Sequence, residues 1–462
     1  IIMKKLLYMV VAVLALSSCN NWFDVAPKEE YIDEDALFSS ESAFRNALNG
    51  IYTELRSSEL FGSNLGLGGI EFMGQTLVPD SELKPIAEFD YDSEIMKEKI
   101  DQVWASMYRA IYSCNNLLRL FDKNQDVIFI KGAREVMLAE LKVLRVAMHY
   151  DLVRLFHPAY TSEPSFKGIY WKESTGDELQ QLSTQELCTK MLAQLTESIA
   201  ILKKYDPIYT GESLNSDGLF GMAPSNRVWK MNYYAALGLK ARIALALGTE
   251  TGYLDARACV DEILEGGYFS FATSAGTDFA FSREHLLGLP SPKEGLQALG
   301  YTLFRDKGVV LSPIVQVEEW KQEAPDDIRF RSMNNTLQNL LPKYDSLSIA
   351  VFSGAPQQIP YIKLGEIYLI GAESALKLND ISGAYSYLSS FVDKRFSKTS
   401  IVETSTATEL MEEIEKQYVR EFLGEGQLFY CYKRWNLSSI PSYNGRSIEM
   451  TKAKYVWPIP VN

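Results

Sequence analysis

Apolar residues recur at helical spacing along most of this 462-residue chain. After the polar pair Ser39-Ser40, the apolar positions from Ala43 to Leu55 lie three or four residues apart and form one face of a helix. Similar patterns over 103–118, 136–155 and 187–202 predict three more helices. The second of these is expected to stop at His157-Pro158, because proline cannot continue a helix. The pattern therefore predicts a mostly α fold.

Two later stretches, 235–264 and 367–392, resemble each other. In each, small residues at helical spacing precede a short break and then a second amphipathic helix. Small residues let two helices pack closely as an antiparallel pair, as in tetratricopeptide repeats. The spacing is irregular, so we expect stacked helical hairpins rather than a regular solenoid.

Between these hairpins, residues from about 266 to 360 are rich in Gly, Pro, Ser and Asn and show few periodic segments. Long irregular segments in a compact body are usually functional, so this stretch is predicted to be a loop-rich insertion. The glycine-rich stretch 61–74 is likewise expected to be an exposed loop. Thr406 with Glu409 predicts a capping box for a last long helix, and 455–460 is expected to be extended.

The start of the chain has the pattern of a secretory signal peptide. Lys4 and Lys5 precede an apolar run, Leu6–Leu16, which is too short to cross a bilayer. The following Leu-Ser-Ser-Cys resembles the lipobox of bacterial lipoproteins, which predicts a signal peptide over 1–18 and lipidation of Cys19. Residues 19–38 are acidic and aperiodic and are predicted to form a tether. An ordinary signal peptide followed by an unrelated cysteine stays an alternative.

Composition narrows the function classes. An apolar fraction of 47% with 23% charged residues is typical of a globular protein, and the net charge of −13 argues against nucleic-acid binding. The remaining cysteines are far apart and are expected to be buried free thiols: Cys114, Cys188, Cys259 and Cys431. The three histidines show no metal-ligand spacing, and we find no phosphate-binding or nucleophile motif. The sequence therefore predicts no metal, no cofactor and no enzyme activity.

Several segments, in this order, resemble one family: FSSESAFRNALNGIYTEL, AELKVLRVAMHYDLVRLF, NYYAALGLKARIALALG, YIKLGEIYLIGAESALKLND, YVREFLGEGQLFYCYKRW and YVWPIP. The chain resembles the SusD/RagB family of outer-membrane nutrient-binding lipoproteins. The resemblance implies a single SusD-like domain over 39–462, with tetratricopeptide-like hairpins supporting a loop-rich binding face. The sequence departs from the family pattern at Leu428 and Cys431, where we expect apolar packing in place of a polar contact.

The resemblance also implies a partner and a location. The partner is a TonB-dependent, SusC-like barrel in the outer membrane, on which the lipid-anchored protein sits as a lid facing the cell exterior. The ligand is a glycan or, as in RagB-like lids, a peptide. Two alternatives stay open: an anchored hydrolase of glycan or peptide, and a purely structural lid.

For ligand contact we select aromatic residues of the predicted loops, because a sugar face packs on an aromatic ring while its hydroxyls meet nearby polar groups. The rings are Phe72, Tyr91, Tyr301, Trp320 and Tyr344, with Asp326, Asp327 and Arg329 as polar partners. Any one of these rings could instead pack beneath a loop. Trp104, Trp229 and Trp435 fall in helical patterns and are assigned to the core.

A charged cluster, Arg420, Glu421 and Glu425, is the alternative chemical site. Its two glutamates lie four residues apart, on one helix face. Glycosidases need two carboxyl groups on opposite sides of the scissile bond. We therefore interpret this cluster as part of the fold.

Overall fold

The computed structural model describes residues 34–214, 222–273, 278–291, 295–332, 341–344, 358–397 and 401–460. The predicted signal peptide and Cys19 lie outside these ranges, as does most of the tether. The predicted tether was expected to lack regular structure, but its end forms a short helix, α2 (Glu34–Leu37). Glu34 pairs with Arg119 at 2.7 Å and with Lys123 at 3.4 Å, which places α2 against α6 (Glu94–Lys123).

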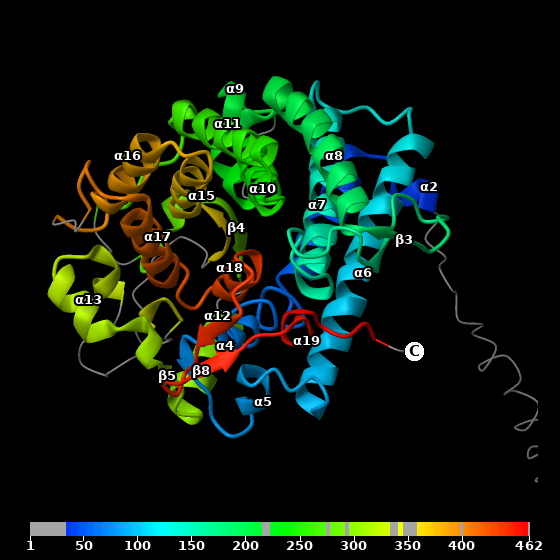
Figure 1. Ribbon diagram of the computed structural model, residues 1–462. Coiled ribbons are helices and arrows are strands. Elements are labelled where there is room, and N and C mark those ends of the chain that lie inside the picture. The colour runs from blue at the N-terminus through cyan, green and yellow to red at the C-terminus, as the bar shows by residue number, and fades with distance from the viewer. Residues whose placement is uncertain are drawn as a thin grey trace, which may run out of the picture.

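Four helical hairpins form most of the described body (Figure 1). They pair α3 (Glu41–Leu55) with α6, α7 (Ala133–Phe156) with α8 (Thr184–Tyr205), α10 (Tyr233–Ala246) with α11 (Glu250–Gly266), and α15 (Leu364–Lys377) with α16 (Ile381–Val392). Successive hairpins contact each other through α6 and α7, α8 and α10, and α11 and α15. The expectation of a mostly α protein built from stacked hairpins is confirmed.

Local sequence signals set the helix ends. α7 ends at Phe156, just before His157-Pro158. α8 and α17 (Ala407–Glu421) both begin with a complete capping box, formed by Ser183 with Glu186 and by Thr406 with Glu409. A Cβ atom at Gly371 would lie 3.0 Å from Val260 and Tyr387, so a small residue is needed where α15 meets α11 and α16.

The histidines and cysteines of the hairpins belong to the core, as predicted. His149 Nδ1 donates to the Arg145 carbonyl at 2.8 Å, and its Nε2 accepts from the Lys172 amide at 3.2 Å. His157 is buried with similar partners. Burial lowers the pKa of each imidazole to about 3. The four predicted free thiols are buried.

The region between α11 and α15 consists, in its described residues, of short helices and strands joined by loops. Its two longer strands, β4 (His285–Pro290) and β6 (Gln358–Lys363), pair antiparallel. Short helices connect the rest: η3 (Ser282–Glu284), α12 (Gly295–Tyr301), η4 (Thr302–Asp306), η5 (Pro313–Val315), α13 (Val317–Glu323), η6 (Ile328–Ser332) and η7 (Pro342–Tyr344). β5 (Val310–Leu311) pairs with β1 (Leu77–Val78), so this region contacts an earlier part of the chain.

The remaining short elements lie in the connections and at the end of the chain. They are α4 (Ile70–Met73), α5 (Lys84–Ala87), β2 (Lys167–Trp171), β3 (Gln180–Ser183), α9 (Pro207–Thr210), η2 (Pro224–Trp229), α18 (Leu428–Arg434), β7 (Ser439–Pro441), β8 (Ser447–Glu449) and α19 (Lys452–Tyr455). Leu428 and Cys431 are buried, which confirms the expected apolar packing. The Trp457 amide donates to the Leu155 carbonyl at 3.0 Å and attaches the final extended segment to the end of α7.

Candidate functional site

A groove of about 520 Å³ lies between η5, α17, the end of α18 and the turn that joins β7 to β8. We call it the C-terminal groove. Its lining residues are Pro313, Ile314, Val315, Gln316, Glu412, Glu415, Lys416, Val419, Arg420, Tyr432, Trp435, Leu437, Pro441, Ser442, Gly445 and Arg446. Ligand pockets commonly enclose 300–1,000 Å³, so the groove has the size of a binding site.

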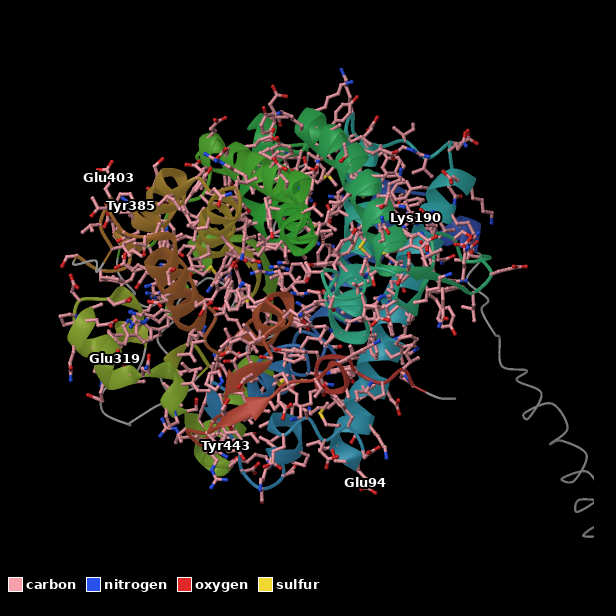
Figure 2. All side chains as sticks on the ribbon, viewed as in Figure 1. Glu94, Lys190, Glu319, Tyr385, Glu403 and Tyr443 are labelled. Carbon is pink, nitrogen blue, oxygen red and sulfur yellow. The ribbon has the colours of Figure 1, made fainter. Side chains whose placement is uncertain are left out.

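The chain makes this groove by turning sharply after α18. Asn436 adopts a left-handed conformation, with φ of +52°, and this redirects the chain from the helix toward β7. The β7–β8 hairpin closes through a hydrogen bond of 2.7 Å from the Ser442 amide to the Arg446 carbonyl. Gly445, at φ +77°, takes the turn position that other L residues rarely adopt. Tyr443, labelled in Figure 2, lies at the outer edge of this hairpin.

Trp435 is the half-buried aromatic ring of the groove wall. Its Nε1 donates to Glu373 Oε1 at 3.0 Å, and its ring meets Tyr418 edge-on at 5.4 Å between centroids. The Arg434 guanidinium lies 5.4 Å from the indole centroid. These contacts fix the ring before any ligand arrives, so a ligand that stacks on it need not order it.

Charged side chains of both signs line the rest of the groove. Lys416 and Arg420 both pair with Glu323, at 3.2 Å and 2.7 Å. Burial, followed by the nearby carboxylates Glu373 and Glu412, raises the pKa of Glu415. The exposed Arg446 adds a cation on the hairpin side. The groove therefore offers hydrogen-bond donors and acceptors beside an aromatic ring.

None of the eight ligand-contact residues predicted from sequence lines this groove. The expectation that their rings are exposed is wrong for Phe72, Trp320 and Tyr344, which are 0%, 0% and 4% exposed. The glycine-rich stretch 61–74 is buried rather than an exposed loop. A Cβ at Gly69 would lie 2.1 Å from the Asn64 carbonyl oxygen, so the glycine there permits close backbone packing.

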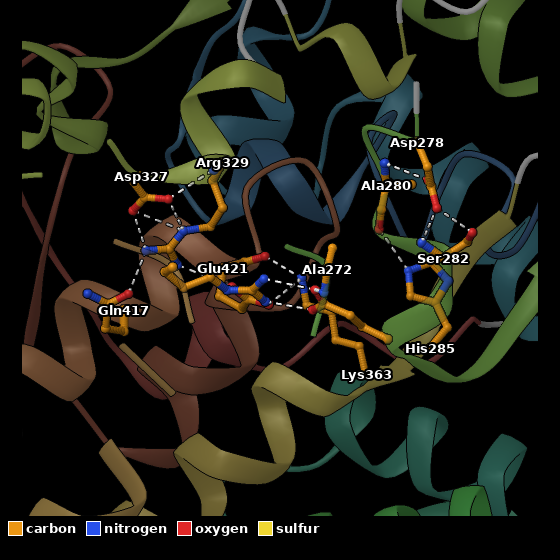
Figure 3. A network of polar contacts seen from close by, with 12 residues as sticks. Ala272, Asp278, Ala280, Ser282, His285, Asp327, Arg329, Lys363, Gln417 and Glu421 are labelled. Carbon is orange, nitrogen blue, oxygen red and sulfur yellow. Dashed lines mark hydrogen bonds and ion pairs between the residues drawn. The ribbon is translucent and has the colours of Figure 1, made fainter. Parts of the chain in front are cut away.

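The predicted polar partners Asp327 and Arg329 are buried in an ion cluster (Figure 3). Arg329 donates to Asp327 at 2.7 Å, to Gln417 at 2.8 Å and to Glu421 at 3.1 Å. The Trp320 indole N–H donates to the same Asp327 carboxylate at 2.9 Å. These groups are engaged in contacts within the fold, which argues against a direct contact of Asp327 or Arg329 with a ligand.

The cluster continues through Glu421 to the rest of the insertion. We use the name buried ion cluster for the set Glu284, Asp327, Arg329, Lys343, Lys363, Arg395, Glu421 and Glu425. Burial opposes ionisation of Glu421, but Arg395, Lys363 and Arg329 outweigh it and lower its pKa to about 2. Two carboxylates held ionised by shared cations do not form a general acid and base pair, which supports the interpretation of Glu421 and Glu425 as part of the fold.

Three predicted contacts stay predictions. Tyr301 is 46% exposed on α12. Tyr91 is half-buried and donates to the Lys454 carbonyl, and the exposed Asp326 accepts from the Ser397 amide at 3.0 Å.

Trp435 was missed because its helical context indicated the core. It is instead half-buried, as are Trp104 and Trp229. The signal that was available is its position directly after the last residue of α18, where the chain turns.

Two negative findings concern the described residues alone. None of their helices combines the length and apolar character that spanning a membrane requires. No group of three or more His, Cys, Asp or Glu side chains within the described ranges is arranged to hold a metal ion.

Comparison with known proteins identifies the fold and gives a family match for the C-terminal part of the chain. A family model described as "SusD family" matches residues 317–460, which include α17, α18 and the groove hairpin. A SusD superfamily protein from Bacteroides thetaiotaomicron superposes with a TM-score of 0.71 at 20% identity, over 91% of this chain and 96% of that one. The family model thus matches the C-terminal part of the chain, and the solved structure shares the fold of nearly the whole chain.

Two further proteins that are similar to this chain carry informative names. "SusD-like protein P25" from Formosa agariphila is 25% identical over 171 residues, which are 35% of this chain and 32% of that protein, so the match spans about a third of the relative's length. A structure described as a SusD-like carbohydrate binding protein, from Bacteroides vulgatus, gives a TM-score of 0.66 at 18% identity, over 88% of this chain and 85% of that one. At these identities the structures show the fold alone.

Proposed function

We propose that this SusD-like protein captures an oligomeric nutrient, a glycan, in the C-terminal groove and delivers it to a TonB-dependent, SusC-like barrel without covalent chemistry. The observation that carries the proposal is the Trp435 ring, fixed on the wall of an open groove. The solved relative from Bacteroides vulgatus that is described as carbohydrate binding supports the choice of a glycan.

The physical fit is that of a sugar on an aromatic platform. A pyranose ring has an apolar C–H face that packs on an indole, and its hydroxyls need polar partners around the edge. The groove places Gln316, Glu415, Lys416 and Arg446 around Trp435. An open groove also accepts a chain that continues beyond it, as an oligosaccharide does.

The experiment titrates the purified protein with a panel of oligosaccharides and peptides and follows the heat released. We expect a glycan to bind and Trp435→Ala to weaken its binding by about 5- to 150-fold, by analogy with the stacking of a base on an aromatic ring, which contributes about 1–3 kcal/mol. Trp435→Phe should retain part of the affinity. Tyr112, which is 58% exposed on α6, gives the matched control Tyr112→Ala, which should be silent.

Other outcomes identify the alternatives. Binding of peptides instead of glycans would make the protein a RagB-like lid, and release of cleaved products would identify a hydrolase. If neither class of ligand binds while the protein still co-purifies with a barrel, it is a structural lid. Loss of binding in Tyr301→Ala, with Trp435→Ala unaffected, would move the site to the face predicted from sequence.

The proposed location rests on Cys19, which lies outside the described residues. We propose that its thiol carries the lipid that holds the protein on the outer face of the outer membrane. Cys19→Ala should leave ligand binding by the purified protein intact and abolish uptake by cells. Growth of that mutant on the nutrient, or full protection of the wild-type protein from protease added to intact cells, would contradict the lid arrangement.

A further inference from the structure

A second cavity, of about 90 Å³, is lined by residues of α7, α8, α10, α15, α17 and α18. Most of its wall is apolar, with Val153, Pro158, Leu245, Ile370 and Phe422 as examples. Half-buried residues such as Ala159, Tyr160 and Ala246 also line it. α18 separates the two sites: Tyr430 and Cys431 line this cavity, whereas Tyr432 and Trp435 line the C-terminal groove.

One wall of the cavity carries a guanidinium with spare hydrogen-bonding capacity. Arg242 is 7% exposed, and its Nε and Nη2 donate to Glu366 at 2.6 Å and 2.7 Å. Nη2 also donates to the Tyr361 carbonyl at 2.7 Å. Among the described residues, no acceptor meets its Nη1. Buried donors in proteins are nearly always paired, so this one calls for an acceptor.

The wall also carries more cations than carboxylates. Arg154 pairs with Asp151, Arg242 with Glu366, and Arg434 with Glu373. The fourth cation, Lys433, donates to the backbone carbonyls of Arg154 and Leu155, at 2.7 Å and 3.4 Å.

Those two carbonyls belong to the last turn of α7, where the helix dipole supplies only about half an elementary negative charge. Lys433 is 4% exposed, and burial together with Arg154 lowers its pKa well below the ordinary value, which disfavours its ammonium form in the empty cavity. An anion bound beside Lys433 would favour the ammonium form and form an ion pair with it.

We propose that this cavity binds a small organic carboxylate whose apolar body contacts Val153, Leu245 and Ile370 and whose carboxylate group accepts hydrogen bonds from Arg242 and Lys433. A carboxylate has the acceptor geometry that a guanidinium matches, and its negative charge favours the ammonium form of Lys433. The short apolar wall selects a chain the size of a short aliphatic acid. This binding is independent of the groove and needs no glycan.

The test titrates the purified protein at pH 7 with sodium hexanoate, and with 1-hexanol and hexylamine as the neutral and cationic counterparts of the same chain length. Hexanoate is expected to bind saturably with a Kd below about 1 mM. It should bind at least tenfold more tightly than hexanol, and hexylamine should not bind. Equal affinities for hexanoate and hexanol, or no saturable heat with hexanoate, would overturn the proposal.

Two variants locate the binding. Ala246→Phe fills the cavity from its edge without changing a charge and should abolish hexanoate binding, whereas Ala193→Phe, on the exposed face of α8, should have no effect. Lys433→Met should weaken hexanoate at least tenfold and leave hexanol unchanged. If Lys433→Met does not fold, Ala246→Phe still decides, because hexanoate binding that survives it overturns the proposal. Glycan titrations of the same variants report on the groove separately.

Discussion

The hairpin layer and the insertion differ in the balance of the forces that hold them, although the buried Arg242–Glu366 pair also joins α10 to α15 within the hairpin layer. In the α15–α16 hairpin the contacts are apolar, with Leu388, Phe391 and Val392 fully buried. The segments around η6, by contrast, attach to β6 and α17 through the buried ion cluster. Apolar contacts are non-directional and add up over many residues, whereas ion pairs in the interior need defined partners. The many apolar contacts of the repeated hairpins therefore favour a stable scaffold. The position of the insertion, by contrast, depends on a few specific ion pairs.

Removing a cation from the buried ion cluster should give the largest effect. Arg395 is fully buried and pairs with both Glu284 and Glu421, at 2.7 Å and 2.6 Å. Arg395→Met leaves both carboxylates without this partner, and the free energy of unfolding is expected to fall by about 3–5 kcal/mol. Urea denaturation followed by circular dichroism measures it.

The matched control is an exposed ion pair on the hairpin layer. Arg109 pairs with Glu54 at 2.6 Å, and the two side chains are 59% and 28% exposed. Arg109→Met should change the free energy of unfolding by no more than about 1 kcal/mol. Equal losses in Arg395→Met and Arg109→Met would remove the distinction between the two regions.

Overpacking a hairpin contact tests the other side of the comparison. A side chain at Gly371 meets Val260 and Tyr387 at once. Gly371→Leu should therefore lower the free energy of unfolding by about 1–3 kcal/mol, measured by the same urea titration.

Gly50 in α3 has no atom within 4 Å of its Cβ position. Gly50→Ala should instead stabilise the protein by about 0.5–1 kcal/mol, since alanine favours the helix. Stabilisation by both substitutions would contradict the close packing of α15.

Acid should destabilise the two regions in different pH ranges. The folded protein holds His149 neutral with a pKa of about 3, whereas in the unfolded chain an imidazole binds a proton below about pH 6.5. Unfolding therefore takes up protons, and stability falls as pH drops from about 6.5 toward 3. Glu421, with a folded pKa of about 2, contributes stability that is lost only as pH falls from about 4.5 toward 2.

The variant His149→Gln separates these ranges, because glutamine can donate to the Arg145 carbonyl and accept from the Lys172 amide without titrating. Between pH 7.5 and pH 5, the wild-type protein should lose about 2 kcal/mol more of its unfolding free energy than this variant does. Denaturation curves at the two pH values measure the difference. Identical pH dependence in both proteins would mean that His149 is protonated in the fold.

The sequence was informative wherever the pattern was local. Helix ends at Pro158 and at the Thr406 cap, the paired hairpins and the buried histidines all follow from spacing and residue type. The site was not accessible in the same way, because exposure depends on what distant segments cover. Trp320 is buried by its own insertion and Phe72 by the packing of a glycine-rich segment, while Trp435 becomes accessible through the turn at Asn436. Aromatic residues in an irregular segment therefore do not reveal which rings face solvent.

The smallest effects should be the same in both regions, because they depend on one helix end only. Ser183 caps α8 in the hairpin layer, and Thr406 caps α17 beside the buried ion cluster, each with a reciprocal glutamate. Ser183→Ala and Thr406→Ala should each lower the free energy of unfolding by about 1 kcal/mol. The double variant should lose the sum within about 0.5 kcal/mol, provided that the caps act independently. A much larger loss for Thr406→Ala would mean that the start of α17 is energetically coupled to the buried ion cluster. The two regions would then differ in the stability of their helix ends as well as in their long-range contacts.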